Sequence, residues 1–273
     1  MNDMFGFTEE QIHRYARHIV LPQLGGKGQR KLLDSRVLIV GVGGLGSPVS
    51  LYLAAAGVGT LGLVDNDVVD VSNLQRQIVH RNTNVGRPKV ASAADALHAL
   101  NPDVNIVQHQ VTFSSANAME LVAGYDLVVE CSDNFPSKYL ANDACVLADK
   151  PLVWGAVFQF DGQMSVTLPR RGPCYRCIFP APPPPGSVPT CVEAGVLGAL
   201  VGIVGCWQAL EVIKLLAGIG EPMAGRLLIL DGLAGEADRV EVKRRSSCEI
   251  CGDHPTIHQL IDYQVFCGLR RVG

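Results

Sequence analysis

Short apolar runs alternate with longer segments of helical character through the first 150 residues. The apolar runs predict buried strands at residues 36–40, 60–64, 104–108 and 125–130. The segments between them predict helices at residues 8–20, 46–57, 88–100, 115–123 and 134–147. Strands that alternate with helices of this length predict right-handed crossovers and a mostly parallel sheet covered on both faces. The chain therefore reads as α/β, with a doubly wound Rossmann-like layout.

The pattern changes after residue 150. Strands are predicted at residues 151–157, 163–168, 227–231 and 239–243, around one long helix at 196–217, and we expect them to extend the sheet with antiparallel pairs. The proline-rich stretch at 179–189 cannot form a helix or a central strand, so we expect an exposed crossing loop. We interpret residues 1–273 as a single domain, with a helical segment at 1–35, a nucleotide-binding core at 36–150, a sheet extension at 151–251 and a tail at 252–273.

Composition narrows the class of protein. The chain is 48% hydrophobic and 18% charged, with a net charge of −3 and no long run of one sign, so we expect neither a nucleic-acid nor a membrane partner. The N-terminus has acids where a secretory signal needs a basic start, and we expect a cytoplasmic protein. The uncharged run at 194–207 is shorter than the ~20 apolar residues that span a bilayer, which favours a core helix.

A glycine-rich loop, GVGGLG, lies at residues 41–46 between a predicted strand and a predicted helix. Such a loop lets the backbone turn tightly and brings a phosphate to the positive end of the helix. Asp65 ends the next strand, where a carboxylate can accept hydrogen bonds from ribose hydroxyls. The combination predicts nucleotide binding but leaves the nucleotide open, because an NAD-dependent oxidoreductase would carry the same loop and acid.

Two cations and a second acid follow downstream. Arg76 and Lys89 suit contacts to a triphosphate, whereas a nicotinamide cofactor has only a pyrophosphate to neutralise. Asp133 follows a predicted strand, at the sheet edge where ligands bind, and one carboxylate plus substrate phosphates is a common way to hold Mg²⁺. Alternatively, Asp133 N-caps the helix that begins near Pro136, and the two roles are compatible.

These motifs, in this order and spacing, closely resemble the ubiquitin-activating-enzyme-like adenylyltransferases, and among them the bacterial MoeB/ThiF/HesA branch. The resemblance extends from about Arg14 to about Cys251. It is carried by GVGGLG, Asp65-x-Asp67, Ser72-Asn73-Leu74-Gln75-Arg76-Gln77, Pro88-Lys89 and Cys131-Ser132-Asp133-Asn134.

The resemblance implies a role for several of these residues. Asp65 would hold the ribose, Gly44 would line the adenosine site, and Asp133 would bind Mg²⁺. Asn73, Arg76 and Lys89 would contact the phosphates. Arg17 matches an N-terminal arginine that reaches the triphosphate of the other subunit in a homodimer. The full nucleotide site is expected to comprise Gly41, Gly43, Gly44, Gly46, Asp65, Asp67, Ser72, Asn73, Leu74, Gln75, Arg76, Lys89, Asp133 and Asn134.

Cysteines occur nine times, an odd number that argues against a closed disulfide framework. Cys174, Cys177, Cys248 and Cys251 form two C-x-x-C pairs, which favour a closed tetrahedral site for structural Zn²⁺. Free core thiols and a redox pair are the alternatives, and the family resemblance also implies structural zinc.

Cys191 follows the proline-rich stretch. Near a helix start its pKa would be lowered, which favours the thiolate. In the family this context carries the cysteine that attacks an acyl-adenylate or exchanges sulfur, whereas the alternative is a small packed residue. The remaining thiols that we considered lie in apolar or tail contexts, where inert packing is expected: Cys131, Cys145, Cys206 and Cys267.

The resemblance implies ATP-dependent adenylation of the C-terminal glycine carboxylate of a small ubiquitin-fold sulfur carrier that ends in Gly-Gly. Pyrophosphate would leave, and a thiocarboxylate would form for molybdopterin, thiamine or thiolated tRNA. The chain ends at Gly273, before the rhodanese-like domain of some relatives, so we expect a separate persulfide donor. The alternatives are an NAD-dependent oxidoreductase and a zinc-stabilised nucleotide-binding scaffold without catalysis.

Overall fold

An eight-stranded sheet forms the centre of the computed structural model, which describes residues 6–187 and 194–270. The strand order is β3-β2-β1-β4-β5-β6-β7-β8. The strands are β1 Arg36–Val40, β2 Thr60–Val64, β3 Asn105–His109, β4 Leu127–Glu130, β5 Leu152–Phe158, β6 Asp161–Thr167, β7 Arg226–Asp231 and β8 Glu236–Glu241. Pairing is parallel from β3 to β5 and antiparallel from β5 to β8. The predicted α/β fold with an antiparallel extension is confirmed.

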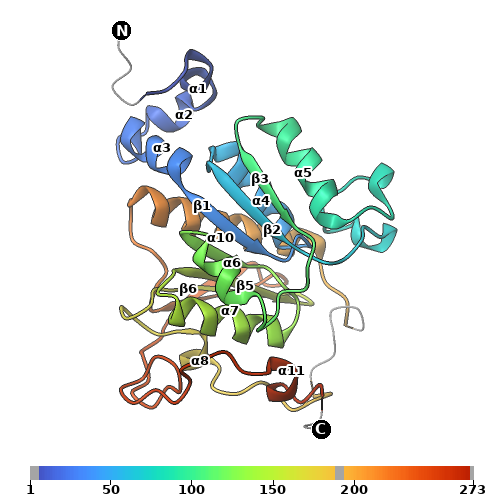
Figure 1. Ribbon diagram of the computed structural model, residues 1–273, viewed down its shortest axis with the longest axis vertical. Coiled ribbons are helices and arrows are strands. Elements are labelled where there is room, and N and C mark those ends of the chain that lie inside the picture. The colour runs from blue at the N-terminus through green and yellow to red at the C-terminus, as the bar shows by residue number, and fades with distance from the viewer. Residues whose placement is uncertain (1–5, 188–193, 271–273) are drawn as a thin grey trace.

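Helices cover both faces of this sheet (Figure 1). They are α1 Glu9–Arg14, α2 Ala16–Ile19, α3 Gly25–Asp34, α4 Gly46–Ala56, α5 Lys89–Leu100, α6 Ala118–Ala123, α7 Phe135–Leu147, α8 Tyr175–Ile178, α10 Gly198–Ala217 and α11 Tyr263–Phe266, with 3-10 turns η1 Val71–Asn73 and η2 Asn82–Asn84. Alternate residues of β1 divide the core: Val37 and Ile39 pack with α3, α4, α5 and α10, whereas Leu38 and Val40 pack with α6 and α7. A strand buried on both faces explains why 36–40 reads as a continuous apolar run.

The chain reverses its winding direction at β1. From β1 the sheet grows through β2 to β3 on one side, and the chain then returns to place β4 on the other side of β1. Ligands bind in open α/β sheets beyond the carboxyl ends of the strands at such a switch point. The glycine loop follows β1 and residues 131–134 follow β4, so both expected binding segments meet there.

The N-terminal region differs from the single helix predicted at 8–20. Tyr15 leaves helical geometry, with φ −98° and ψ 12°, and separates α1 from α2. Its ring is buried against Gly57, where an added Cβ would lie 2.5 Å from the ring, and its hydroxyl accepts a hydrogen bond from Asn101 at 2.9 Å. Tertiary packing therefore breaks the helix. Helix α3 was not predicted as a separate element, because its sequence, GGKGQRKLLD, has three glycines.

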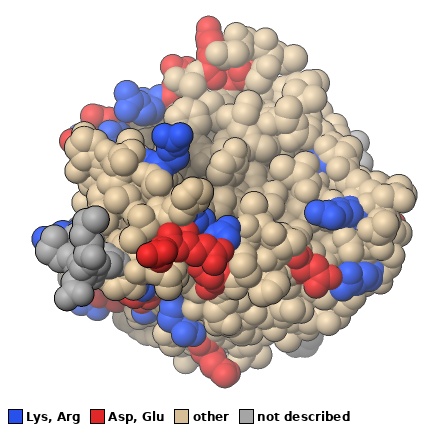
Figure 2. Space-filling view, turned by 90° about the horizontal axis from the view of Figure 1, so that it is seen from above, with Lys and Arg blue, Asp and Glu red and all other residues tan. Residues whose placement is uncertain are grey.

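Helix α10 is long and apolar enough to cross a membrane by length and composition alone. In this chain it packs against α3, α4, β5 and β6, as a core helix does. An apolar stripe on the helix remains accessible, with Ile203 and Leu210 about half exposed. Elsewhere on the surface, basic and acidic side chains stand in small mixed groups over the face shown in Figure 2.

A buried ion pair joins three elements on the α7 side of the sheet. Arg176 on α8 donates from Nη2 to Asp143 Oδ2 on α7 at 2.8 Å, and both side chains are at most 1% exposed. The Tyr263 hydroxyl of α11 donates to the same carboxylate at 2.8 Å. Arg176 also lies over the rings of Tyr139 and Phe266. Both Arg176 and Asp143 thus have further contacts besides each other, and a buried ion pair needs such contacts to offset its loss of hydration.

We expect Asp143→Asn to lower the free energy of unfolding by about 3–5 kcal/mol, because it leaves the buried Arg176 charge with only the exposed Glu249 carboxylate, 3.4 Å away, as a counterion. Asp149→Asn is the matched control: its pair with Arg170 spans 3.5 Å and is exposed, and such pairs contribute at most about 1 kcal/mol. Urea unfolding of both variants measures the difference. Equal midpoints for the two variants would contradict the structural importance of the buried pair.

Candidate functional site

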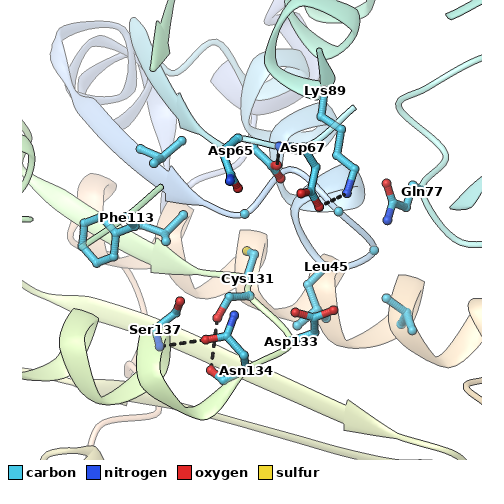
Figure 3. Close-up of a pocket in the computed structure, with 18 of the residues that line it drawn as sticks. Leu45, Asp65, Asp67, Gln77, Lys89, Phe113, Cys131, Asp133, Asn134 and Ser137 are labelled. Carbon is cyan, nitrogen blue, oxygen red and sulfur yellow. Dashed lines mark hydrogen bonds and ion pairs between the residues drawn. The ribbon is translucent and has the colours of Figure 1, made fainter. Parts of the chain in front are cut away.

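A cavity opens at the switch point, beyond the carboxyl ends of β1, β2 and β4. Figure 3 shows Asp65, Asp67 and Lys89 on one wall, with Cys131, Asp133, Asn134 and Ser137 on the opposite wall. The remaining lining residues are Val40, Gly41, Gly43, Gly44, Leu45, Val64, Asn66, Arg76, Gln77, Val111, Thr112, Phe113, Ser132, Val157, Val196 and Val201. Acidic, basic and apolar groups therefore face one space.

The glycine loop makes the floor of this cavity. Gly41 has φ +91°, a value that favours glycine. Gly46 does not line the cavity, and an added Cβ there would lie 2.0 Å from the Gly41 carbonyl oxygen. Gly46 is thus required for the turn itself, whereas Gly43 and Gly44 line the space. Helix α4 begins at Gly46 without a side-chain cap, which leaves its N-terminus suited to an anion.

Asp65 is held by two backbone amides. Its Oδ2 accepts from Val42 N at 2.8 Å and its Oδ1 accepts from Asp67 N at 2.9 Å. These bonds fix the carboxylate at the cavity wall beside the glycine loop. A carboxylate oxygen accepts more than one hydrogen bond, so Asp65 retains capacity for a ligand hydroxyl.

The two cations differ in their partners. Lys89 is nearly buried and pairs with Asp67 at 2.9 Å, whereas Asp67 itself is exposed. Arg76 donates to the Ser72 carbonyl oxygen at 3.2 Å and has no acidic partner among the ion pairs of the described residues. The cavity therefore holds one compensated and one uncompensated cation, which is an arrangement suited to a polyanion.

Residues 131–134 are positioned from beneath by a buried pair. Lys138 Nζ lies 2.5 Å from Glu130 Oε2, donates to the Gly155 carbonyl at 2.6 Å and donates to the Ser132 carbonyl at 2.9 Å. The Ser132 amide donates to Glu130 at 2.8 Å. Burial raises the pKa of Glu130, and the Lys138 ammonium opposes that shift. The loop that carries Asp133 is consequently fixed to both β4 and β5.

Asp133 does not cap the following helix. The N-cap of α7 is Asn134, whose side chain accepts from Ser137 N at 2.9 Å. The capping alternative for Asp133 is therefore wrong. Asp133 is exposed at the cavity, and it has no cationic partner among the ion pairs of the described residues, so its carboxylate is available to a ligand.

Some predicted site residues lie outside the cavity. Ser72 and Asn73 bond with Asp70 in a capping arrangement around η1, and they do not line the space, nor do Leu74 and Gln75. Arg17 is exposed on α2 and does not line it either. Cys191 lies outside the described residues. The structure brings together the glycine loop, the acids and Arg76 with Lys89, while the 72–75 segment supports the turn that presents Arg76.

Sequence reasoning missed several lining residues. Phe113 and Thr112 come from the loop after β3, and no local signal distinguishes them from other loop residues. Gln77 belongs to a motif that the sequence singled out, but no role followed from it. The turn that carries Gln77 is joined to the glycine loop by His80, which is 5% exposed.

His80 bridges two segments of the site. Its Nε2 lies 3.0 Å from the Val42 carbonyl oxygen and its Nδ1 lies 2.9 Å from Ser92 Oγ on α5. Because a carbonyl only accepts, Nε2 carries the proton, and Nδ1 accepts from the Ser92 hydroxyl. Burial lowers the pKa of His80, which favours this neutral form.

An apolar groove adjoins the cavity and shares Ser132, Asp133, Asn134 and Val157 with it. Its walls include the aromatic side chains of Tyr139, Trp154, Tyr175 and Phe179 and the prolines of residues 182–185. The proline-rich stretch was expected to be an exposed loop, and its described part forms one side of this groove. The groove leads from the surface of the molecule to the acidic residue Asp133.

The four C-x-x-C cysteines form a cluster at the base of α8. The Sγ atoms of Cys174, Cys177, Cys248 and Cys251 lie within 4.8 Å of one another, with close pairs from 3.3 to 4.0 Å. Tetrahedral zinc with Zn–S bonds of about 2.3 Å places its sulfurs about 3.8 Å apart. Hydrogen bonding within the cluster lowers the pKa of Cys177 and of Cys248, whereas the pKa of Cys174 and of Cys251 is raised. The donor set therefore fits a closed zinc site.

The other described thiols are not poised for reaction. Burial raises the pKa of Cys131 and Cys145, and it raises that of Cys267 to about 11. Burial also raises the pKa of Cys206. Reactive cysteines have lowered pKa values, so these four resemble packed side chains.

The chain is similar in sequence and in fold to known proteins. The ThiF family model matches residues 15–250. A sulfur carrier protein adenylyltransferase of Thermus thermophilus is 52% identical, over 97% of this chain and 99% of the relative. The adenylyltransferase and sulfurtransferase MOCS3 of Mus musculus is 50% identical over 96% of this chain, which spans only 57% of that protein. The solved structure of Escherichia coli MccB has a TM-score of 0.81 at 21% identity, over 93% of this chain and 76% of that chain, which supports the fold.

Proposed function

Because the chain belongs to the ThiF family and is an adenylyltransferase, we propose that it adenylates the C-terminal glycine carboxylate of a small ubiquitin-fold sulfur carrier protein. The proposal rests on one observation: two hollows of the molecule meet at Asp133. One is a cavity with cations and a glycine loop, and the other is an apolar groove that reaches it from the surface. The first suits ATP and the second suits an extended peptide end.

ATP would lie along the cavity from the β3 side to Lys89. Asp65 would accept from the ribose hydroxyls, and Gly43 and Gly44 would admit the phosphates next to the N-terminus of α4. Arg76 and Lys89 would contact phosphate oxygens. Asp133 would hold Mg²⁺, which neutralises phosphate charge when bound. Lys89 already has Asp67 as a counterion, so phosphate binding would share or replace that pair.

The carrier's Gly-Gly end would enter through the groove, because residues without a Cβ let the peptide backbone approach the site closely. Its carboxylate is ionised at neutral pH and needs no general base. One carboxylate oxygen forms a bond to the α-phosphorus, and the bond from that phosphorus to the leaving pyrophosphate breaks. The protein would accelerate this step by positioning the two reactants and by spreading the negative charge over its cations.

The terminal sulfur of a separate persulfide donor would then attack the acyl carbon, either of the acyl-adenylate itself or of a thioester formed first on Cys191, and would displace AMP or the Cys191 thiolate to give an acyl disulfide. A second thiol would attack the donor's sulfur in that disulfide, so that the thiocarboxylate leaves and a disulfide forms between the two thiol sulfurs. Molybdopterin, thiamine and thiolated tRNA synthesis are the proposed destinations of that sulfur. Neither an NAD-dependent oxidoreductase nor a non-catalytic scaffold needs a groove that reaches a triphosphate site, and neither is an adenylyltransferase.

ATP–pyrophosphate exchange with a Gly-Gly-terminated carrier tests the proposal. We expect exchange in the wild type and its loss, by at least about 100-fold, in Arg76→Ala, because removal of a transition-state charge contact costs about 2.7–4 kcal/mol. Arg87→Ala is the matched control, since Arg87 is exposed, pairs with Asp95 at 2.8 Å and does not line the cavity. Hydride transfer without exchange would overturn the proposal, as would nucleotide binding without turnover for any carrier.

We also propose a homodimer in which Arg17 serves the partner's site. Its support is the accessible apolar stripe of α10, where Ile203 is 52% and Leu210 is 50% exposed, beside Tyr52 of α4 at 57%. A second copy would cover this face, and apolar contact area of this kind is typical of homodimer interfaces. Arg17 is free to reach another subunit, because it is exposed and does not line its own cavity.

Mixing two inactive variants tests the shared site. We expect Arg17→Ala and Arg76→Ala each to lose exchange, whereas an equal mixture regains about a quarter of wild-type activity, since random pairing gives half heterodimers with one intact site each. Exchange assays after subunit mixing measure the recovery, and sedimentation checks the dimer. A mixture no more active than its components would show that Arg17 does not act across subunits.

A structural zinc ion is proposed for the four-cysteine cluster. We expect about one Zn²⁺ per chain, the content of a closed Cys₄ site. Cys248→Ser should reduce it and lower the thermal midpoint, because the metal contributes folding free energy. Cys206→Ser, on α10 away from the cluster, is the control for metal content. A folded wild-type protein free of metal would contradict the zinc site.

A further inference from the structure

Gln77 is a buried polar side chain that lacks a partner. It is 4% exposed, and its Oε1 accepts no hydrogen bond in the structure. Three such buried atoms occur among residues 6–187 and 194–270, and the other two, Trp154 Nε1 and Gln208 Oε1, belong to side chains outside the nucleotide cavity. A buried acceptor without a donor is destabilising, so native proteins keep few of them, and each calls for a cause.

The location of Gln77 suggests the missing donor. The side chain lines the cavity between the glycine loop and Lys89, and Figure 3 shows its amide on the side of the cavity where Asp67 and Lys89 lie. An added Cβ at Gly43 would lie 3.5 Å from its Nε2. The amide is therefore close to the part of the glycine loop that would meet a nucleotide.

The backbone that carries Gln77 is fixed from both ends. Its amide donates to the Asn73 carbonyl oxygen at 2.9 Å, and its carbonyl accepts from His80 N at 3.1 Å. His80 in turn bonds Val42 of the glycine loop and Ser92 of α5. These bonds hold the backbone of the turn at the cavity, whereas no hydrogen bond in the described part of the chain holds the side-chain amide, so Oε1 can turn toward a ligand.

We propose that Gln77 is a nucleotide-contacting residue whose Oε1 accepts a hydrogen bond from an O–H donor of the bound nucleotide complex. The inference rests on the proposed ATP binding and adds to it a neutral acceptor, distinct from the Asp65 carboxylate, on the side of the site where Arg76 and Lys89 only donate. A ribose hydroxyl and a water molecule carried by the nucleotide-bound Mg²⁺ share the required chemistry. Stability is given up in the free protein so that the acceptor is ready for the ligand.

The variant Gln77→Leu keeps the approximate shape of the side chain and removes its amide. Calorimetric titration of the variant and of the wild-type protein with MgATP tests the contact. We expect Kd to rise about 3- to 10-fold, the value of one hydrogen bond. Without nucleotide, the thermal midpoint should stay the same or rise, because an unpartnered buried oxygen has been removed. Gln108→Leu, on the exposed edge strand β3, should change neither quantity.

Two further arms identify the donor. Titration with 2′-deoxy-ATP and 3′-deoxy-ATP should bring the ratio of variant to wild-type Kd close to one if a ribose hydroxyl is the donor. Titration of the protein with ATP in the presence of EDTA should bring the same Kd ratio close to one if the donor is a water bound to the metal. Either result supports the acceptor role.

Three results would overturn the inference alone: an unchanged Kd for MgATP, a ratio that persists in every arm, or a lower thermal midpoint of the variant without nucleotide, which would indicate a structural role. A wild-type protein that does not bind ATP would instead overturn the proposed function, and this inference with it.

Discussion

The site depends on the close approach of two backbone segments at the switch point. An added Cβ at Gly46 would lie 2.0 Å from the Gly41 carbonyl oxygen, and one at Gly41 would lie 3.0 Å from the Cys131 carbonyl oxygen. Glycine at both places lets α4 start directly above β1 and lets the β4 loop lie alongside it. Any side chain there would push these elements apart. The cavity between them is a consequence of that contact.

Around this contact, hydrogen bonds and an ion pair within the protein hold the walls of the cavity in place. Two backbone amides orient Asp65, while His80 joins the glycine loop to α5. The Glu130–Lys138 pair fixes the β4 loop from beneath. Burial of charged groups and of a neutral imidazole costs free energy unless their hydrogen-bonding atoms have partners. Most of the hydrogen-bonding atoms of these buried side chains have a partner here. The walls of the cavity are thus positioned by the fold before any ligand arrives.

The sequence was most informative where local pattern and chemistry coincide. The apolar run at 36–40 predicts a buried strand, the glycine loop predicts a tight turn between strand and helix, and the paired cysteines favour one cluster; the fold and the positions of the four sulfurs agree with these predictions. The break at Tyr15 could not be predicted, because the cause is Gly57, far along the chain. The alternative that Asp133 caps α7 is wrong because its neighbour Asn134 does so, and the sequence could not separate them since both residue types are good caps. Phe113 and Gln77 needed the fold, because a loop residue's exposure depends on distant segments.

The residue between the two cysteines of the first pair links the metal site to the rest of the molecule. Arg176 lies between Cys174 and Cys177 in the chain, yet its guanidinium donates hydrogen bonds to Asp143 and packs on the aromatic rings around it. The cysteine cluster, α7 and the C-terminal helix α11 therefore share one buried charge. Substitution of one residue of this buried group leaves the remaining residues without their partner. We therefore expect the residues of the group to change together in evolution.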